Sequence, residues 1–333
     1  MSWPPRKGGT GGFKMGENLL FSLNSTMPMF FLILFGYILK RINFLDNNFI
    51  ATANKFVFHV TLPVMLFLDL AGTDLRASFD GRYILFCAGV TTASILVIWV
   101  LARLLLRDKS LVGEFVQACY RSSAAILGAA FIQNIYGNSG MSGLMILGSV
   151  PLYNIFAVLI LTLESPAAEG QKDTAAKLKK SLKGIVTNPI LLGILAGLAA
   201  ALVRLPIPTM AEKTLSSLSA LTSPLALLAI GAGFKGRAAL GQLRLTAIAS
   251  VTKLVILPAL FLPLAVRLGF ADEKLVALLV MLGSITTPSS YVMARQMGHD
   301  GTLTGSVCVV TTVLSALTLT GWLFWARTNG YIL

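Results

Sequence analysis

Two stretches of the chain place small hydroxyl side chains, together with Gly or Pro, inside long apolar segments. They read CYRSSAAILGAAFIQNIYG (119–137) and MLGSITTPSSYVMARQMG (281–298). Pro288 has no N–H to donate and clashes with the preceding turn, so we expect its helix to break near Thr286 and Thr287. The N-terminus of a half-helix presents unpaired N–H groups and the positive end of a dipole. Two such ends that face each other could hold a carboxylate.

Close helix packing is the alternative role for the same small residues, because they let two backbones approach each other. Residue types alone leave both roles open. The candidate substrate-binding residues are Ser122, Ser123, Gly128, Thr286, Thr287, Pro288 and Ser289.

Ionisable side chains inside apolar segments are a second source of candidate chemistry, because a charge within a bilayer is costly and usually functional. Arg121 precedes the first hydroxyl cluster, Lys253 lies in TAIASVTKLVILP (246–258), and Asp69 lies near the end of another apolar segment. Arg121 and Lys253 could pair with substrate, or with a carboxylate such as Asp69 or Glu114. Each could instead extend its charge to the membrane surface. No carboxylate pair in mid-segment indicates a proton relay or a sodium site, so either ion remains a candidate for coupling.

Other chemistry has little support in the residues. Cys87, Cys119 and Cys308 lie within apolar segments without a C-x-x-C spacing, and His59 and His299 are far apart. These patterns favour packing over a metal site or a disulfide. No nucleophile elbow or phosphate loop is present in the sequence. We therefore expect no enzyme activity, no cofactor and no bound metal.

Composition indicates that these residues lie in an all-α polytopic membrane protein. Of the 333 residues, 55% are hydrophobic and 12% are charged, whereas soluble proteins carry about 25% charged residues. Runs such as LFSLNSTMPMFFLILFGYIL (20–39) have the length needed to cross a bilayer. The formal charge of +13 is concentrated in the gaps between such runs. This placement indicates membrane topology and contact with lipid headgroups, not nucleic-acid binding.

Ten apolar segments organise the chain, and a polar basic stretch divides them five and five. The segments run about 20–40, 49–71, 82–106, 114–136, 142–163, 185–204, 212–234, 243–267, 274–297 and 302–326. We expect a disordered tail (1–19), a first five-helix repeat (20–163), a basic linker (164–184) and a second repeat (185–333). Gaps on the linker's side carry 13 Lys and Arg against 10 on the other side. The linker is therefore predicted to be cytoplasmic and both termini extracytoplasmic.

The two halves share a pattern at an offset of 161 residues. TLPVMLFLDLAG (61–72) matches TSPLALLAIGAG (222–233) in its Thr, Pro, one Leu, Ala and Gly positions. The further matching pairs are Pro28 with Pro189, Gly36 with Gly197, Gly137 with Gly298, and Gly140 with Gly301. An odd number of spans in each copy reverses the second copy in the membrane. Such inverted repeats are typical of secondary transporters whose substrate site lies near the midplane, although Pro and Gly also occur in membrane helices simply as kinks.

Several of these stretches together resemble the auxin efflux carrier family, in its bacterial branch of malonate and malate permeases, which is related to the bile-acid sodium symporters. They are TLPVMLFLDLAG, FVQACYRSSAAILGAAFIQNIYGNSG, KGIVTNPILLGILAGL, TSPLALLAIGAGF, KLVILPAL and TPSSYVMARQMGHDG, and they extend over nearly the full chain. The resemblance implies ten helices in an inverted repeat, with broken helices four and nine crossing at the substrate site. It also implies elevator-type transport, with helices 1, 2, 6 and 7 as the scaffold.

Two departures from the family pattern affect the fourth segment. The family often has Arg-x-Asn followed by Gly-x-Pro, whereas this chain has Arg121-Ser122-Ser123 and then Gly128-Ala129-Ala130. Loss of the Asn and the Pro could soften the crossover and alter the choice of substrate. The ninth segment retains Pro288.

The resulting hypothesis is a secondary transporter of small organic anions, mono- or dicarboxylates, in a bacterial inner membrane. A sodium-coupled bile-acid-type symporter and a membrane ligand sensor that does not transport are the alternatives. The expected partners are the anion, a coupling proton or sodium ion and membrane lipid, and a homodimer is compatible with the sequence.

Overall fold

The computed structural model describes residues 15–72, 80–136, 140–165, 184 and 186–332, and every regular element in these ranges is a helix. Seven helical stretches in these ranges are long and apolar enough to cross a membrane. The expectation of an all-α fold with membrane-length helices is therefore confirmed. The first helix begins at Met15, inside the range expected to be a tail, and residues 1–14 lie outside the described part. Most of the predicted linker, 166–183, also lies outside it.

The first half of the chain is interrupted within its fourth apolar segment. Its helices are α1 (Met15–Arg41), α2 (Asn47–Phe56), α3 (Leu62–Ala71), α4 (Gly81–Leu105), α5 (Val112–Tyr120), α6 (Ala124–Tyr136) and α7 (Gly140–Leu163). A π-helical turn, η1 (Val57–Thr61), joins α2 to α3, and a 3₁₀ turn, η2 (Lys109–Leu111), precedes α5. Residues 121–123 are non-helical and separate α5 from α6. The interruption therefore falls before Gly128, which lies inside α6.

The second half is interrupted where the sequence predicts a break. Its helices are α9 (Pro189–Val203), α10 (Thr209–Ala220), α11 (Thr222–Ala232), α12 (Gly236–Gly241), α13 (Leu243–Val251), α14 (Leu257–Arg267), α15 (Asp272–Gly283), α16 (Ser289–Gln296) and α17 (Thr302–Thr328). A π-helical turn, η4 (Thr252–Ile256), joins α13 to α14. Residues 284–288 are non-helical, and Pro288 is the N-cap of α16. The predicted break near Thr286 and Thr287 is confirmed.

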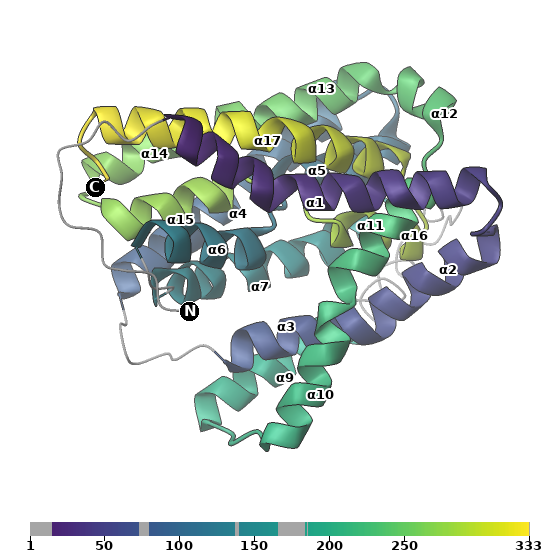
Figure 1. Cartoon of the computed structure of the whole chain (residues 1–333), viewed down its shortest axis with the longest axis horizontal. Coiled ribbons are helices and arrows are strands. Elements are labelled where there is room, and N and C mark those ends of the chain that lie inside the picture. The colour runs from purple at the N-terminus through teal and green to yellow at the C-terminus, as the bar shows by residue number, and fades with distance from the viewer. Residues whose placement is uncertain (1–14, 73–79, 137–139, 166–183, 185, 333) are drawn as a thin grey trace.

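One set of helices packs through glycines that bring backbones into contact. α1 packs on α11, and α3 packs on α9. A Cβ added to Gly36 would collide with the backbone of Leu228, and one added to Gly197 would lie 2.7 Å from the carbonyl oxygen of Phe67. Such close approach requires residues without a side chain. In Figure 1, α9 and α10 lie beside α3 at the bottom of the view, away from α15 and α17.

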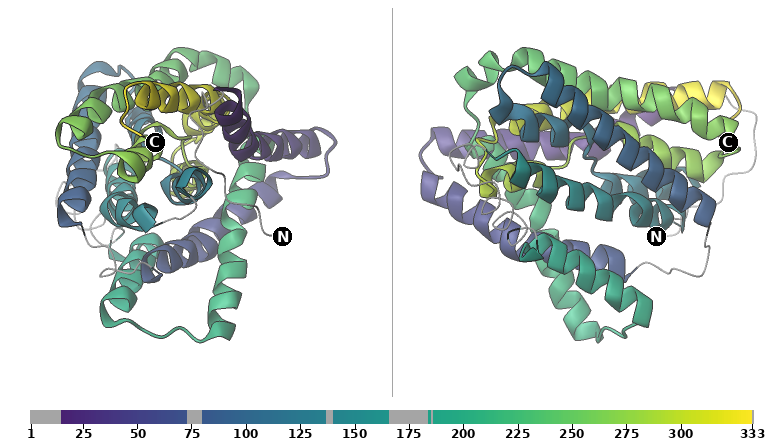
Figure 2. Two further views of the ribbon diagram at one scale, coloured as in Figure 1. Left: turned by 60° about the vertical axis from the view of Figure 1, so that its left-hand side comes forward. Right: turned by 180° about the vertical axis from the view of Figure 1, so that it is seen from behind.

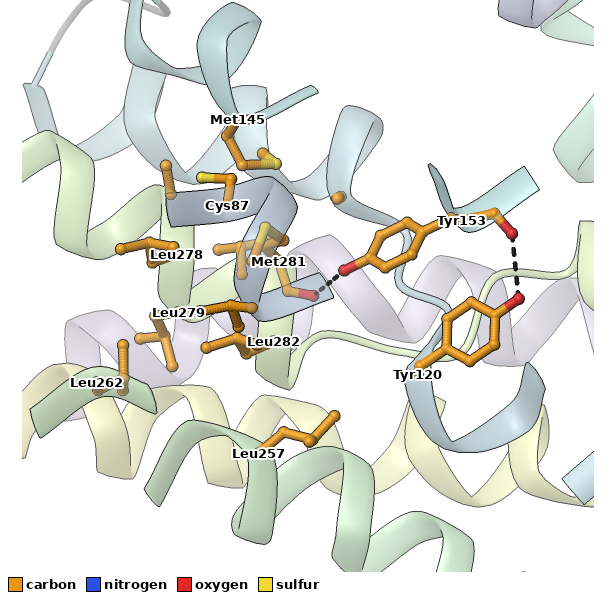
Figure 3. Packing of buried hydrophobic residues seen from close by; sticks show 14 of the residues in the cluster. Cys87, Tyr120, Met145, Tyr153, Leu257, Leu262, Leu278, Leu279, Met281 and Leu282 are labelled. Atoms are coloured by element: carbon orange, nitrogen blue, oxygen red, sulfur yellow. Dashed lines mark hydrogen bonds between the residues drawn. The ribbon is translucent and has the colours of Figure 1, made fainter. Parts of the chain in front are cut away.

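The remaining helices, α4–α7 and α13–α17, surround the largest apolar core. In Figure 3, Leu278, Leu279 and Leu282 of α15 lie near Leu257 and Leu262 of α14. The two interrupted helices meet inside this set, where α6 packs on α15 and α5 contacts α16. Seen from behind in Figure 2, α4 crosses the face opposite to α1. Both breaks are consequently surrounded by packed side chains.

Candidate functional site

The two helix breaks are joined to each other by hydrogen bonds. The Ser123 backbone N–H donates to the Ile285 carbonyl over 3.1 Å. The Thr286 hydroxyl donates to the Ala118 carbonyl over 2.9 Å, and the Ser122 hydroxyl donates to the Met281 carbonyl. Each break therefore satisfies carbonyl groups near the C-terminal end of the opposite half-helix, which would otherwise lack partners.

The C-terminal ends of α5 and α15 are satisfied by further donors. Lys253 is fully buried, and its ammonium group donates to the Tyr120 carbonyl over 3.0 Å and also to the Ser122 hydroxyl. A cation at this end complements the helix dipole. Figure 3 shows the hydroxyl of Tyr153 donating to the Met281 carbonyl, a bond of 3.0 Å, and that of Tyr120 donating to the Tyr153 carbonyl. Carbonyl groups at the ends of both half-helices are thus bound to donors.

Arg121 lies at the break between α5 and α6, and its side chain is buried. Its Nη2 lies 2.8 Å from Oδ1 of Asn154 and 3.1 Å from the hydroxyl of Ser289, and its Nη1 contacts the sulfur of Met293. Its Nε has no hydrogen-bond partner among the described residues. No ion pair of Arg121 forms within the same ranges. The guanidinium charge is therefore compensated only by neutral polar groups.

A cavity of about 40 Å³ lies beside the two breaks. It is lined by Leu62, Met65, Leu66, Asp69, Arg121, Ser122, Ser123, Ala124, Ala125, Val150, Tyr153, Asn154, Thr222, Ser223, Thr287 and Ser289. One part of the lining comes from α3 and α11, and the other comes from the breaks, α6, α7 and α16. The structure thus brings together six of the residues singled out from sequence: Arg121, Ser122, Ser123, Thr287, Ser289 and Asp69.

Four other singled-out residues do not line this cavity. Gly128 faces α7, and a Cβ added to it would lie 2.6 Å from the terminal methyl of Met145. Thr286 is turned toward Ala118 and α17, Pro288 caps α16, and Lys253 binds the end of α5. Gly128 therefore packs against α7, whereas Thr286, Pro288 and Lys253 hold the ends of the half-helices at the breaks.

Glu114 does not pair with Arg121 or Lys253, in contrast to one partner that the sequence suggested. Its carboxylate accepts hydrogen bonds from the backbone N–H groups of Gly301, over 2.8 Å, and Thr304, over 3.0 Å. These groups lie at the start of α17, where the helix dipole favours an anion. The reason for the difference is that Glu114 lies in the first turn of α5, at the opposite end from Arg121.

The sequence patterns did not single out the cavity residues of α7 and α11 as candidates. Tyr153 and Asn154 lie in α7, and Thr222 and Ser223 begin α11. A signal existed for Asn154, since an amide within an apolar segment is a functional candidate in the same way as a charge. Thr222 and Ser223 directly precede Pro224 in the repeated stretch.

The wall of the cavity formed by the breaks has positive character. The Arg121 guanidinium lies there, and the first N–H groups of α6, including those of Ala124 and Ala125, have no intrahelical acceptor. The carbonyl ends of the half-helices are already bound to donors. The described residues contain no group of three or more His, Cys, Asp or Glu side chains suited to a metal ion. This wall is chemically suited to a small anion, while Asp69 lines the part of the cavity formed by α3 and α11.

Comparisons with known proteins agree with a membrane transporter. Residues 21–323 match the family described as "Membrane transport protein". The chain is 26% identical over 325 residues to a "Putative malonate transporter" of Rhizobium meliloti, covering 91% of this chain and 95% of that protein. It is 23% identical over 304 residues to an "Uncharacterized transporter" of Methanothermobacter thermautotrophicus, covering 90% and 97%. The chain belongs to this family of integral membrane transporters, in agreement with its sequence resemblance to the auxin efflux carriers.

Proposed function

We propose that the protein is a secondary transporter of small organic anions, mono- or dicarboxylates, which bind in the cavity beside the helix breaks. The observation that carries this proposal is Arg121, a buried cation at the cavity wall that forms no ion pair among the described residues. A guanidinium binds a carboxylate through two parallel hydrogen bonds. Ser289 and Ser123 add hydroxyl groups at the same wall. The name of the Rhizobium meliloti relative, which specifies a dicarboxylate, supports this substrate class.

Substrate entry requires the cavity to widen. A volume of about 40 Å³ holds only a few water molecules. Its two walls belong to different sets of helices, because Asp69 and Thr222 lie on α3 and α11 whereas Arg121 and Thr287 lie at the breaks. A displacement of one set against the other would open the site.

We infer that this displacement is an elevator movement. The scaffold would consist of α1, α2–α3, α9 and α10–α11, which the glycine contacts of Gly36 and Gly197 hold together. The transport domain would consist of α4–α7 and α13–α17. Among the described residues, polar contacts that join the two sets include the hydrogen bond between the hydroxyls of Thr320 in α17 and Ser22 in α1, over 3.2 Å. The exposed ion pair of Lys235, in the turn after α11, with Asp300 is another, with its nitrogen and oxygen 2.7 Å apart. Exposed pairs contribute little free energy and can separate readily.

Ten spans in two inverted repeats are the architecture that fits this mechanism. The count adds α9 and the two broken helices to the seven membrane-length stretches. The offset of 161 residues supports the repeat, since Gly36 contacts Leu228 just as Gly197 contacts Phe67. The Lys and Arg distribution supports a cytoplasmic linker and extracytoplasmic termini. Proton or sodium coupling and a homodimer remain parts of the proposal to be tested.

Transport by purified protein in proteoliposomes tests the proposal. Malonate, malate, short monocarboxylates, indole-3-acetate and taurocholate would be applied with and without sodium on a solid-supported membrane, and radiolabelled counterflow would detect electroneutral exchange. We expect saturable transport of a mono- or dicarboxylate whose apparent affinity falls in Arg121→Gln. A requirement for sodium together with selectivity for taurocholate would favour the bile-acid-type symporter. Binding without counterflow would favour a sensor.

A further inference from the structure

A second and larger cavity adjoins α4, α5 and α13. Its volume is about 760 Å³, within the range of about 300–1,000 Å³ that is usual for ligand pockets. It is lined by Ile98, Leu101, Ala102, Leu105, Leu106, Arg107, Asp108, Phe115, Cys119, Arg244, Leu245, Ile248 and Thr252. These residues come from α4 and the turn after it, from α5, and from α13 with η4. None of them lines the cavity that holds Arg121.

The body of this second cavity is apolar and borders the lipid-facing surface. Leu101, Leu105 and Ile248 line it and are 48%, 75% and 43% exposed, on stretches long enough to span a membrane. Phe115 and Cys119 form its buried inner wall. Side chains of this kind, exposed on a spanning helix, face acyl chains. The cavity is therefore accessible from the hydrocarbon layer.

Two arginines lie at the polar end of the same cavity. Arg107 follows the last turn of α4, and Arg244 lies in the first turn of α13, so both are at a membrane surface. Both side chains are exposed, and neither forms a hydrogen bond or an ion pair within the described ranges. The neighbouring Asp108 instead accepts hydrogen bonds from the N–H and hydroxyl of Ser110. The arginines are thus available to an external anion.

We propose that this cavity binds an anionic phospholipid, with an acyl chain in the apolar part and the phosphate held by Arg107 and Arg244. The juxtaposition of an apolar chamber with two unpaired guanidinium groups matches an amphiphile that carries a phosphate. Basic pockets between membrane helices on the cytoplasmic side recognise anionic headgroups. The positive-inside distribution places this end of α4 and α13 on the cytoplasmic side.

The bound lipid would support the break between α5 and α6 from behind. Thr252 and Cys119 line the cavity, and each is directly followed by a residue of the hydrogen bond between Lys253 and the Tyr120 carbonyl. An acyl chain in this cavity packs against η4 and the end of α5, the two elements that the bond joins. Occupancy therefore stabilises the folded transporter.

Native mass spectrometry of the delipidated full-length protein tests this inference with three probes: phosphatidylglycerol, phosphatidylcholine and inorganic phosphate. We expect phosphatidylglycerol to be retained in preference to phosphatidylcholine and to raise the thermal midpoint. The double variant Arg107→Gln with Arg244→Gln lacks both charges. It should bind phosphatidylglycerol more weakly, by about fivefold for each arginine removed. Ile248→Trp, which fills the apolar part, should lower binding while both charges remain. Arg237→Gln removes an exposed arginine of α12 outside the cavity and is the matched control.

The inference is overturned if both lipids bind equally, if the double variant retains phosphatidylglycerol like wild type, or if Arg237→Gln weakens it as much. Stabilisation by inorganic phosphate alone, equal to that by phosphatidylglycerol, would assign the arginines to free phosphate and refute a lipid site. Thermal midpoints without lipid establish that each variant is folded. Counterflow of the carboxylate substrate is measured in parallel, so that failure of the lipid site and failure of the proposed transport activity are separable.

Discussion

The Arg121 guanidinium lies 3.1 Å from the hydroxyl of Ser289 and so connects the end of one half-helix to the start of another. Arg121 is the C-cap of α5, and Ser289 begins α16, 168 residues further along the chain. The same Nη2 atom also lies 2.8 Å from Asn154 of α7. A buried cation held by neutral groups from two elements, α7 and α16, is pre-positioned for the anion that we propose to bind here, so that little reorganisation would be needed.

Arg121→Gln should weaken binding of the carboxylate substrate by about ten- to a hundredfold, because a hydrogen bond to a charged group contributes about 1.5–3 kcal/mol. Arg121→Lys should recover only part of this loss, since an ammonium retains the charge but not the bidentate fork. The measurement is KM in counterflow, with the thermal midpoint as the folding control. If a folded Arg121→Gln protein had the KM of the wild type, Arg121 would not contribute to substrate binding.

Ser123→Leu and Thr287→Leu should each abolish transport, because an added isobutyl group fills much of a cavity of about 40 Å³ that both residues line. The readout is carboxylate counterflow at equal reconstituted protein. Thr214→Leu on the exposed face of α10 makes the same chemical change outside the cavity and should transport normally. Intact transport in both cavity variants, with normal melting, would place the substrate elsewhere.

Pro288 predicts the position of the break before α16, whereas the break before α6 is expected only from the family resemblance and its position has no local signal. Pro288 removes a backbone donor, and that effect is local. Residues 121–123 contain no proline, and their non-helical conformation is held by partners such as the Ile285 carbonyl, which binds the Ser123 N–H. Those partners come from the other half of the chain. A local pattern therefore cannot show where α5 ends.

Polarity identified part of the cavity wall but not the direction of each side chain. Arg121, Ser123 and Thr287 stand out as polar residues in apolar segments, and all three line the cavity. Thr286, the neighbour of Thr287, is equally polar but turns to the Ala118 carbonyl. Within a non-helical segment, side-chain direction depends on tertiary hydrogen bonds, so sequence spacing does not determine it.

Gly197→Ala should lower the free energy of unfolding by about 1–3 kcal/mol, the usual cost of overpacking. A Cβ there would lie 2.7 Å from the Phe67 carbonyl oxygen, and neither backbone can move without separating α9 from α3. Gly89→Ala on α4 is the matched control, because no atom lies within 4 Å of its added Cβ. That control should be neutral or slightly stabilising, by up to about 1 kcal/mol. Thermal melting in detergent measures both; equal melting of the two variants would contradict the contact between α3 and α9.

Lys253→Met should destabilise the protein by about 1–3 kcal/mol, because it leaves the Tyr120 carbonyl buried without its donor. It should also lower the maximal rate of transport, since the Ser122 hydroxyl loses the same ammonium partner. Lys213→Met on the exposed face of α10 is the control and should change neither quantity. Melting and counterflow are measured together. If Lys253→Met melts like Lys213→Met, the ammonium does not hold the break.

The ion pair between Lys274 and Asp80 should make stability depend on pH in the acid range. Hydrogen bonds from the Lys274 ammonium and from the Tyr83 N–H lower the pKa of the Asp80 carboxyl below its ordinary value of 3.8. A carboxyl whose pKa is lower in the folded state stabilises the fold above its unfolded-state pKa. This contribution is lost as pH falls through the folded-state pKa.

Asp80→Asn separates the ion pair from the helix cap, because Asn is an equally good N-cap for α4. Near neutral pH it should cost about 0.2–1 kcal/mol, the usual contribution of a partly exposed pair. Asp80→Ala should cost about 1 kcal/mol more, through loss of the bond to the Tyr83 N–H.

Melting curves between neutral pH and pH values below 3.8 measure both effects. The difference between wild type and Asp80→Asn should shrink as pH falls through this range, and a difference that stays constant or grows would refute the charged pair. In a Lys274→Met background, Asp80→Asn should cost less, since the partner is already absent.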